Sequence, residues 1–216
     1  MADFPYPDTC LIIFARAPIP GMCKTRLVPE LGEQGAADLQ RELIGRCIQQ
    51  LCTDPICATQ LWCAPDSGHV YFQSLAKQYD VSLHTQQGKD LGEKMYHAMS
   101  SSPALNTIIV GTDIPLLSRT YVEHAIGVLR AGMDAVIGPA EDGGYVLLGL
   151  QQIEQGLFTG IDWGTSGVAR QTMDKMTASG LRWRTLDEQW DLDNTGDLER
   201  YRQLKSAELT VKFRNF

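Results

Sequence analysis

The sequence predicts an α/β protein whose mostly parallel central sheet is covered by helices on both faces. Short, continuous apolar runs, typical of strands buried on both faces, alternate along the chain with longer segments whose apolar residues recur at helical spacing. Repeated alternation of this kind indicates parallel strands joined by helical crossovers. No internal repeat, low-complexity stretch or linker divides the 216 residues, so we expect one domain covering residues 1–216.

The first half of the chain begins this alternation with the apolar run CLIIFA (10–15), which predicts a buried strand. The segment 35–52 carries apolar residues at helical spacing and predicts the first helix. The elements expected next are a strand at 58–64, a helix at 69–79, a weaker strand at 81–86 and a helix at 91–102.

The second half contains the clearest buried strand, NTIIVGT (106–112). A helix should follow over 118–132, with Ser118 as its N-cap and Gly132 as its C-terminal stop. Two strands, at 134–140 and 144–150, are separated only by EDG and can add an antiparallel element to the sheet. A helix at 167–180, a strand at 181–187 and a helix at 195–207 complete the predicted order.

The composition narrows the classes of function. The formal net charge of -7 argues against a nucleic-acid polymer as partner, because phosphate backbones are bound by broad positive surfaces. Small phosphorylated ligands stay open, since a few well-placed cations suffice for them. No stretch reaches the roughly 18 apolar residues of a membrane span, and the first residues lack the pattern of a signal peptide. We therefore expect a cytoplasmic protein.

The six cysteines are expected to be reduced and structural. None forms a CxxC pair, and no histidine stands at zinc-finger spacing from them. Four of them fall in segments that predict a helix and then a strand, where a reduced cysteine behaves as a small hydrophobic residue. The six are Cys10, Cys23, Cys47, Cys52, Cys57 and Cys63.

Glycines, prolines and charged residues gather at the ends of the predicted strands. Open α/β sheets bind ligands outside the carboxyl ends of their strands, so these residues can converge on one cleft. The segments concerned are RAPIPGMCKTRL (16–27), QQGKDLG (86–92), GTDIP (111–115), GPAEDGGY (138–145) and WDLDNTGD (190–197).

The first of these segments supplies cations. APIPGMCKTRL (17–27) is close to a phosphate-binding P-loop, but its glycine-to-lysine spacing does not fit, and its two prolines offer no N–H to a phosphate. A backbone cradle would therefore begin at Gly21, and Arg16, Lys24 and Arg26 would supply most of the attraction for phosphate. The alternative is a solvated loop that is merely basic.

Carboxylates follow two of the other strands. Asp113 comes after the clearest buried strand, and Asp191 and Asp193 share one orientation if their segment is extended. Mg²⁺ is typically held by one or two carboxylates together with substrate phosphates, so Asp113 with one of the later aspartates would hold Mg²⁺ or Mn²⁺. Alternatively, Asp193 or Asn194 simply caps the helix that starts near residue 195.

The remaining candidates for nucleotide or phosphate contacts are glycines and acids in two strand-end loops. Those between residues 141 and 144 either form a routine hairpin turn or allow close approach of the backbone to a ligand. Trp163 and Thr165 can line the same cleft, although core packing is the simpler role for the tryptophan. The full set is Gly88, Asp90, Gly92, Glu141, Asp142, Gly143 and Gly144.

Taken together, the motifs resemble a known family. FARAPIPGMCKTRL (14–27), PELGEQGAADL (29–39), GTDIPLL (111–117), GPAEDGGYVLLGL (138–150) and DWGTS (162–166) are similar to motifs of the DUF2064 family, also called selenodomain- or radical-SAM-associated transferase 1. That family is similar in turn to the CofC-like guanylyltransferases and to the GT-A, or nucleotide-diphospho-sugar transferase, superfamily.

This resemblance implies a three-layer α/β/α sandwich with a nucleotide and a divalent metal at the carboxyl edge of the sheet. It assigns phosphate binding to Lys24 and Arg26 and metal binding to Asp113. Asp193 resembles the aspartate of the nucleotidyltransferase D-x-D-T-P-E-D segment. The chain lacks the GGxGTR loop of common nucleotidyltransferases, and Gly111 stands where glycosyltransferases have the first aspartate of D-x-D.

The reaction predicted first is therefore metal-dependent transfer of a nucleoside monophosphate from a triphosphate to a small phosphorylated acceptor. Lys24, Arg26 and Asp113 would be its catalytic residues. The alternatives are glycosyl transfer from a nucleotide sugar, with Glu141 or Asp142 as base, and nucleotide binding without turnover. A homodimer is compatible with the sequence, which does not fix the oligomeric state.

Overall fold

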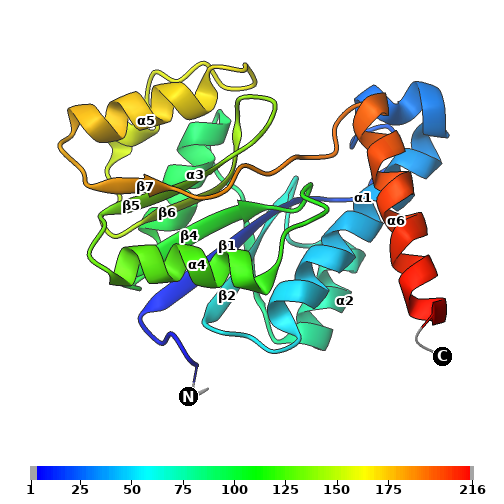
Figure 1. Cartoon of the computed structure of the whole chain (residues 1–216), viewed down its shortest axis with the longest axis horizontal. Helices are drawn as coiled ribbons and strands as arrows, with labels where there is room; N and C mark the ends of the chain where they lie inside the picture. Colours follow the sequence, from blue (N-terminus) through cyan, green and yellow to red (C-terminus); the bar gives the residue numbers. More distant parts are fainter. Residues whose placement is uncertain (1–3, 215–216) are drawn as a thin grey trace.

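A computed structural model describes the chain from residue 4 to residue 214, and the side chains up to residue 207. Seven strands form one sheet in the order β3-β2-β1-β4-β6-β5-β7 (Figure 1). All run parallel except β6, which is antiparallel to both of its neighbours. The strands are β1 Thr9–Arg16, β2 Ala58–Ala64, β3 Ser82–Thr85, β4 Asn106–Gly111, β5 Ala135–Pro139, β6 Tyr145–Leu150 and β7 Trp183–Thr185.

The helices cover both faces of this sheet, which confirms the predicted three-layer α/β/α arrangement. One face packs against α1, α2 and α4, and the other against α3 and α5. Helix α6 lies beside α1 rather than on the sheet (Figure 1). The helices are α1 Val28–Cys52, α2 Val70–Tyr79, α3 Leu91–Ser100, α4 Arg119–Arg130, α5 Val168–Ala178 and α6 Thr195–Arg214.

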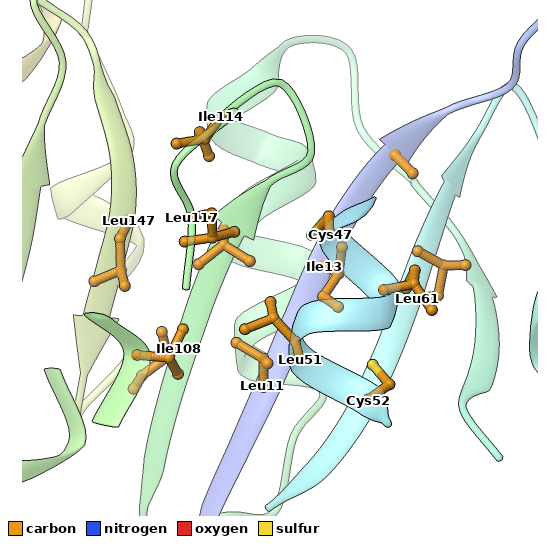
Figure 2. Close-up of a cluster of buried hydrophobic side chains, with 14 of the residues drawn as sticks. Leu11, Ile13, Cys47, Leu51, Cys52, Leu61, Ile108, Ile114, Leu117 and Leu147 are labelled. Atoms are coloured by element: carbon orange, nitrogen blue, oxygen red, sulfur yellow. The ribbon is translucent and has the colours of Figure 1, made fainter. Parts of the chain in front are cut away.

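Alternate side chains of β1 point to opposite faces of the sheet, so the strand packs in both hydrophobic clusters. Leu11 and Ile13 point to the α1 side, where Figure 2 shows them facing Cys47 and Leu51, whereas Ile12 belongs to the opposite cluster. The strand is buried over most of its length, as its continuous apolar run predicts. Strand β1 therefore contributes side chains to the packing on both faces of the sheet.

All six cysteines are free and buried, which confirms the structural reading of the set. Burial raises the pKa of Cys52, Cys57 and Cys63 to about 12, so these thiols stay protonated and unreactive at neutral pH. Figure 2 shows two of the six, Cys47 and Cys52, on the sheet-facing side of α1.

Several element boundaries differ from the sequence-based expectation; for example, α6 ends at Arg214 rather than at residue 207. Helix α1 begins at Val28, before the predicted residue 35, because a short helical segment runs into it across a kink at Gly32 (φ 70°). Strand β7 keeps only three of the seven residues predicted for it. Ser118 caps α4 as predicted, since its side chain accepts a hydrogen bond from the Tyr121 N–H. None of the helices in the described part is both long and apolar enough to cross a membrane.

Candidate active site

A cavity of about 380 Å³ lies at the edge of the sheet where β1 and β4 end and β6 begins. The order of the strands reverses here, because the chain leaves β1 toward β2 on one side and later places β4 on the other. Such a switch point is where open α/β sheets bind ligands. Each of the five strand-end segments singled out in the sequence contributes at least one residue to the lining.

One wall of the cavity is acidic. Asp113 follows β4, Asp142 lies in the turn between β5 and β6, and Asp191 precedes α6. Burial raises the pKa of Asp191 to about 6, with a further contribution from repulsion by Asp142 and Asp193. Asp191 is therefore a partly desolvated carboxylate close to other negative charges, and a cation would stabilise its ionised form.

Lys24 lies behind this wall rather than in the cavity. Its side chain is only 2% exposed, and its Nζ lies 2.8 Å from Asp113 Oδ2 and donates to the Leu192 carbonyl at 2.5 Å. The Leu192 N–H in turn donates to the Asp113 carbonyl at 2.8 Å. Lys24 thus connects the loop after β1 with the segments that contain Asp113 and Leu192. These contacts hold the Asp113 side chain in position. This geometry gives no support to the prediction that Lys24 binds phosphate directly.

Arg26 is exposed and forms an ion pair with Asp193, and neither residue lines the cavity. The alternative role as a helix cap belongs to the next residue, since Asn194 Oδ1 accepts from the Gly196 N–H at 2.8 Å. The pairing of Asp113 with Asp193 as metal ligands stays a prediction. Of the two later aspartates that the sequence leaves open, Asp191 is the one that faces the cavity.

Another part of the lining is apolar and aromatic. Tyr145 and Trp163 meet edge to face with their ring centroids 6.4 Å apart, and Leu91 and Met95 of α3 lie in the same lining. The Tyr145 hydroxyl donates to Met95 Sδ at 3.6 Å. Trp163 is half-buried, so it both packs on the core cluster beneath it and presents a face to the cavity.

Several predicted glycines approach protein rather than open space. A Cβ on Gly92 would lie 2.7 Å from Trp163 Nε1. Gly143 has φ +88°, and a Cβ there would lie 2.1 Å from the Ser166 carbonyl oxygen. Both positions need glycine to bring the cavity-lining segments together. Their role in this structure is therefore packing of the loops.

The predicted site residues divide by location. Asp90 caps α3 through a hydrogen bond from the Glu93 N–H at 2.8 Å, and Glu141 forms an ion pair with Arg200. Lining the first cavity are Arg16, Asp113, Asp142 and Gly144. Arg16 and Gly88 line a second cavity of about 350 Å³ beside it. Lining neither are Gly21, Lys24, Arg26, Asp90, Gly92, Glu141, Gly143 and Asp193.

Sequence reasoning missed some of the lining. Gln40 comes from α1, and Met95 and Lys94 come from α3. In the sequence these are ordinary helix residues without a motif that distinguishes them. Only the packing of α1 and α3 against the sheet brings them to the strand ends.

The acidic wall fits a divalent cation that completes its coordination with ligand oxygens. Among the described residues, no group of three or more His, Cys, Asp or Glu side chains forms a ready-made metal site. Mg²⁺ usually needs only one or two carboxylates, with phosphates and water as its other ligands. Asp113 and Asp191 supply carboxylates of that kind, and burial together with repulsion by Asp142 raises the pKa of Asp191.

Comparison with known proteins identifies relatives of this chain. The family model described as "Uncharacterized protein conserved in bacteria (DUF2064)" matches residues 38–165. A crystal structure from Desulfovibrio desulfuricans G20, of a protein assigned to the nucleotide-diphospho-sugar transferases, is 32% identical. It covers 89% of this chain and 85% of its own, with a TM-score of 0.81. No curated protein matches the sequence significantly.

More distant structures share the fold. The inositol-1-phosphate CTP transferase from T. maritima is 10% identical over 88% of this chain and 91% of its own, with a TM-score of 0.57. A CMP:2-keto-3-deoxy-manno-octonic acid synthetase complexed with CTP is 12% identical over 93% of this chain and 99% of its own, with a TM-score of 0.56.

Proposed function

The chain belongs to the DUF2064 family, and we propose that it is a nucleotide-utilising transferase that holds its donor nucleotide in the cavity beside Asp113. The observation that carries this proposal is the acidic wall of Asp113, Asp142 and Asp191 at the switch point of the sheet. The relative from D. desulfuricans is named for nucleotide-diphospho-sugar transfer, and two more distant relatives are named for CTP-dependent reactions or were solved with CTP.

Asp113 and Asp191 are the residues that would hold a magnesium ion. The ion, when bound, would neutralise charge on the phosphoryl oxygens of the donor. Lys24 fixes the Asp113 carboxylate from behind through its 2.8 Å ion pair. The aromatic residues Tyr145 and Trp163 of the same lining would displace water from a bound nucleotide, which would strengthen electrostatic interactions with it.

We favour nucleotidyl transfer as the reaction. An acceptor oxygen would attack the α-phosphorus, the bond to the bridging oxygen would break, and pyrophosphate would leave with the electron pair. Glycosyl transfer is the second candidate, because Asp142 faces the cavity as a carboxylate that could take a proton from an acceptor hydroxyl. Glu141, the other base predicted for that reaction, is held by Arg200 outside the lining.

Ligand-dependent unfolding tests this proposal. We expect nucleotides to raise the unfolding temperature of the whole chain, and Mg²⁺ to increase the effect, when nucleoside triphosphates and nucleotide sugars are compared. Release of pyrophosphate or of a nucleoside diphosphate in the presence of candidate acceptors separates the two reactions. Binding without either product would indicate a binding module, and no stabilisation by any nucleotide would refute the proposal.

Asp113→Asn tests the carboxylate. We expect the variant to fold and to lose most of the Mg²⁺-dependent part of the stabilisation by nucleotide, since a neutral amide is a poor ligand for Mg²⁺. Asp174→Asn is a matched control, because Asp174 is an exposed residue of α5 that lines neither cavity. Magnesium dependence that is unchanged in Asp113→Asn would remove this residue from the proposed site.

A further inference from the structure

The second cavity is the only one of the two that is lined by cations without carboxylates. It lies between the loop after β1 and the first turn of α3, and its charged lining residues are Arg16 and Lys94. Apart from Gln86 and Gly88, the other lining residues are apolar. Arg16 is exposed and Lys94 is half-buried, so both side chains can reach an anion that enters this cavity.

Neither cation has a carboxylate partner within the described part of the chain. Most other cations near the site do have one: Lys24 pairs with Asp113, Arg26 with Asp193 and Arg200 with Glu141. The side chains of Arg16 and Lys94 take part in none of the ion pairs or hydrogen bonds between described residues. Two positive charges that form no ion pair with a described carboxylate therefore line one concave surface.

At this cavity, the backbone of the loop before α3 packs closely against the first turn of the helix. Gly88 has φ +141°, and a Cβ on it would lie 2.7 Å from the Lys94 N atom, so only glycine lets this loop lie against the start of α3. The Asp90 cap fixes the first turn of α3, which carries Lys94. Arg16, Ala64 and Gln86 line both cavities, so the two are adjacent and share a wall.

We propose that the second cavity binds the pyrophosphate portion of a nucleoside triphosphate, with Arg16 where the two cavities meet and Lys94 beyond it. This inference rests on the proposed function, which places the nucleotide in the first cavity. It makes Lys94 a residue that determines donor specificity. A triphosphate balances both cations, whereas the uncharged sugar of a nucleotide sugar would leave Lys94 without a counter-charge.

Inorganic pyrophosphate is the direct probe, measured by isothermal titration calorimetry on the whole chain. We expect it to bind the unmodified protein and to bind Lys94→Gln about 10-fold or more weakly, because a charge-assisted hydrogen bond to phosphate is lost. Lys94→Arg should retain binding. Lys89→Gln is the matched control, since Lys89 is exposed, lies in the loop that precedes α3 and lines neither cavity.

The donor panel separates this inference from the proposed function. Lys94→Gln should weaken nucleoside triphosphates as it weakens pyrophosphate, and leave the affinities of the corresponding monophosphates and nucleotide sugars within about two-fold. No binding of pyrophosphate, or equal binding by Lys94→Gln, would overturn the assignment of the cavity even if triphosphates bind and react. Failure of every nucleotide to bind would refute the proposed function itself.

Discussion

Asp191→Asn should stabilise the protein at neutral pH, although it removes a residue of the proposed site. Burial and the neighbouring carboxylates raise the pKa of Asp191 from 3.8 to about 6. The folded protein therefore binds a proton more tightly at this position than the unfolded chain does. Asparagine has nearly the same shape and cannot ionise, so it removes the cost of carrying a charge there.

The sign and size of the effect follow from linkage. Below pH 3.8 the carboxyl is neutral in both states; between 3.8 and about 6 only the unfolded chain ionises, so the free energy of unfolding falls as pH rises. Above about pH 6 the cost is complete. Roughly two pKa units correspond to about 3 kcal/mol, and partial exposure of the side chain reduces this to about 1–2 kcal/mol.

Urea unfolding of both proteins between pH 4.5 and 8 measures the difference. We expect Asp191→Asn to gain about 1–2 kcal/mol at pH 7.5 and progressively less toward pH 4.5. Asp174→Asn, on the exposed face of α5, controls for removing one negative charge from a chain of net charge -7. A difference between Asp191→Asn and the unmodified protein that does not change with pH would refute the reasoning.

Two further substitutions separate structural from ligand-binding roles. Lys24→Met should lower the free energy of unfolding by about 2–3 kcal/mol in urea titrations, because Asp113 loses its ion-pair partner and the buried Leu192 carbonyl loses its donor. A loss below about 0.5 kcal/mol would contradict the positioning role of Lys24. Gly143→Ala should lower the free energy of unfolding by about 3 kcal/mol in the same assay, because its Cβ would clash with the Ser166 carbonyl. Gly164→Ala is the control: it also has positive φ but open space around the Cβ, and should cost about 1 kcal/mol. Equal costs would mean that backbone strain alone explains the effect.

The order of strands and helices could be predicted from the sequence because apolar periodicity is a local signal. The buried run of β4 and the Ser118 cap both depend on residues within a few positions of one another. The convergence of strand-end segments also follows from order alone, since carboxyl ends of parallel strands share one edge. These expectations survive errors of several residues in each boundary, such as the early start of α1.

The partner of each charged group could not be predicted in the same way. Lys24 donates to a carbonyl 168 residues further along the chain, and no local pattern encodes that contact. The sequence likewise gives Asp191 and Asp193 equal standing, because alternate residues of an extended segment share one side. The Arg26 ion pair, which holds Asp193 away from the cavity, is a tertiary contact between residues 167 positions apart.

Lys24 and Lys94 show that tertiary contacts, rather than the sequence motif, decide whether a lysine is free to bind phosphate. Moving the buried Lys24 ammonium to a phosphate would break its contacts with Asp113 and Leu192, each worth about 1.5–3 kcal/mol because a charged group is involved. Lys94 has no such partners to give up, although no motif marks it. The two should therefore differ in kind: Lys24→Met reduces stability, whereas Lys94→Gln reduces binding of pyrophosphate and leaves stability unchanged.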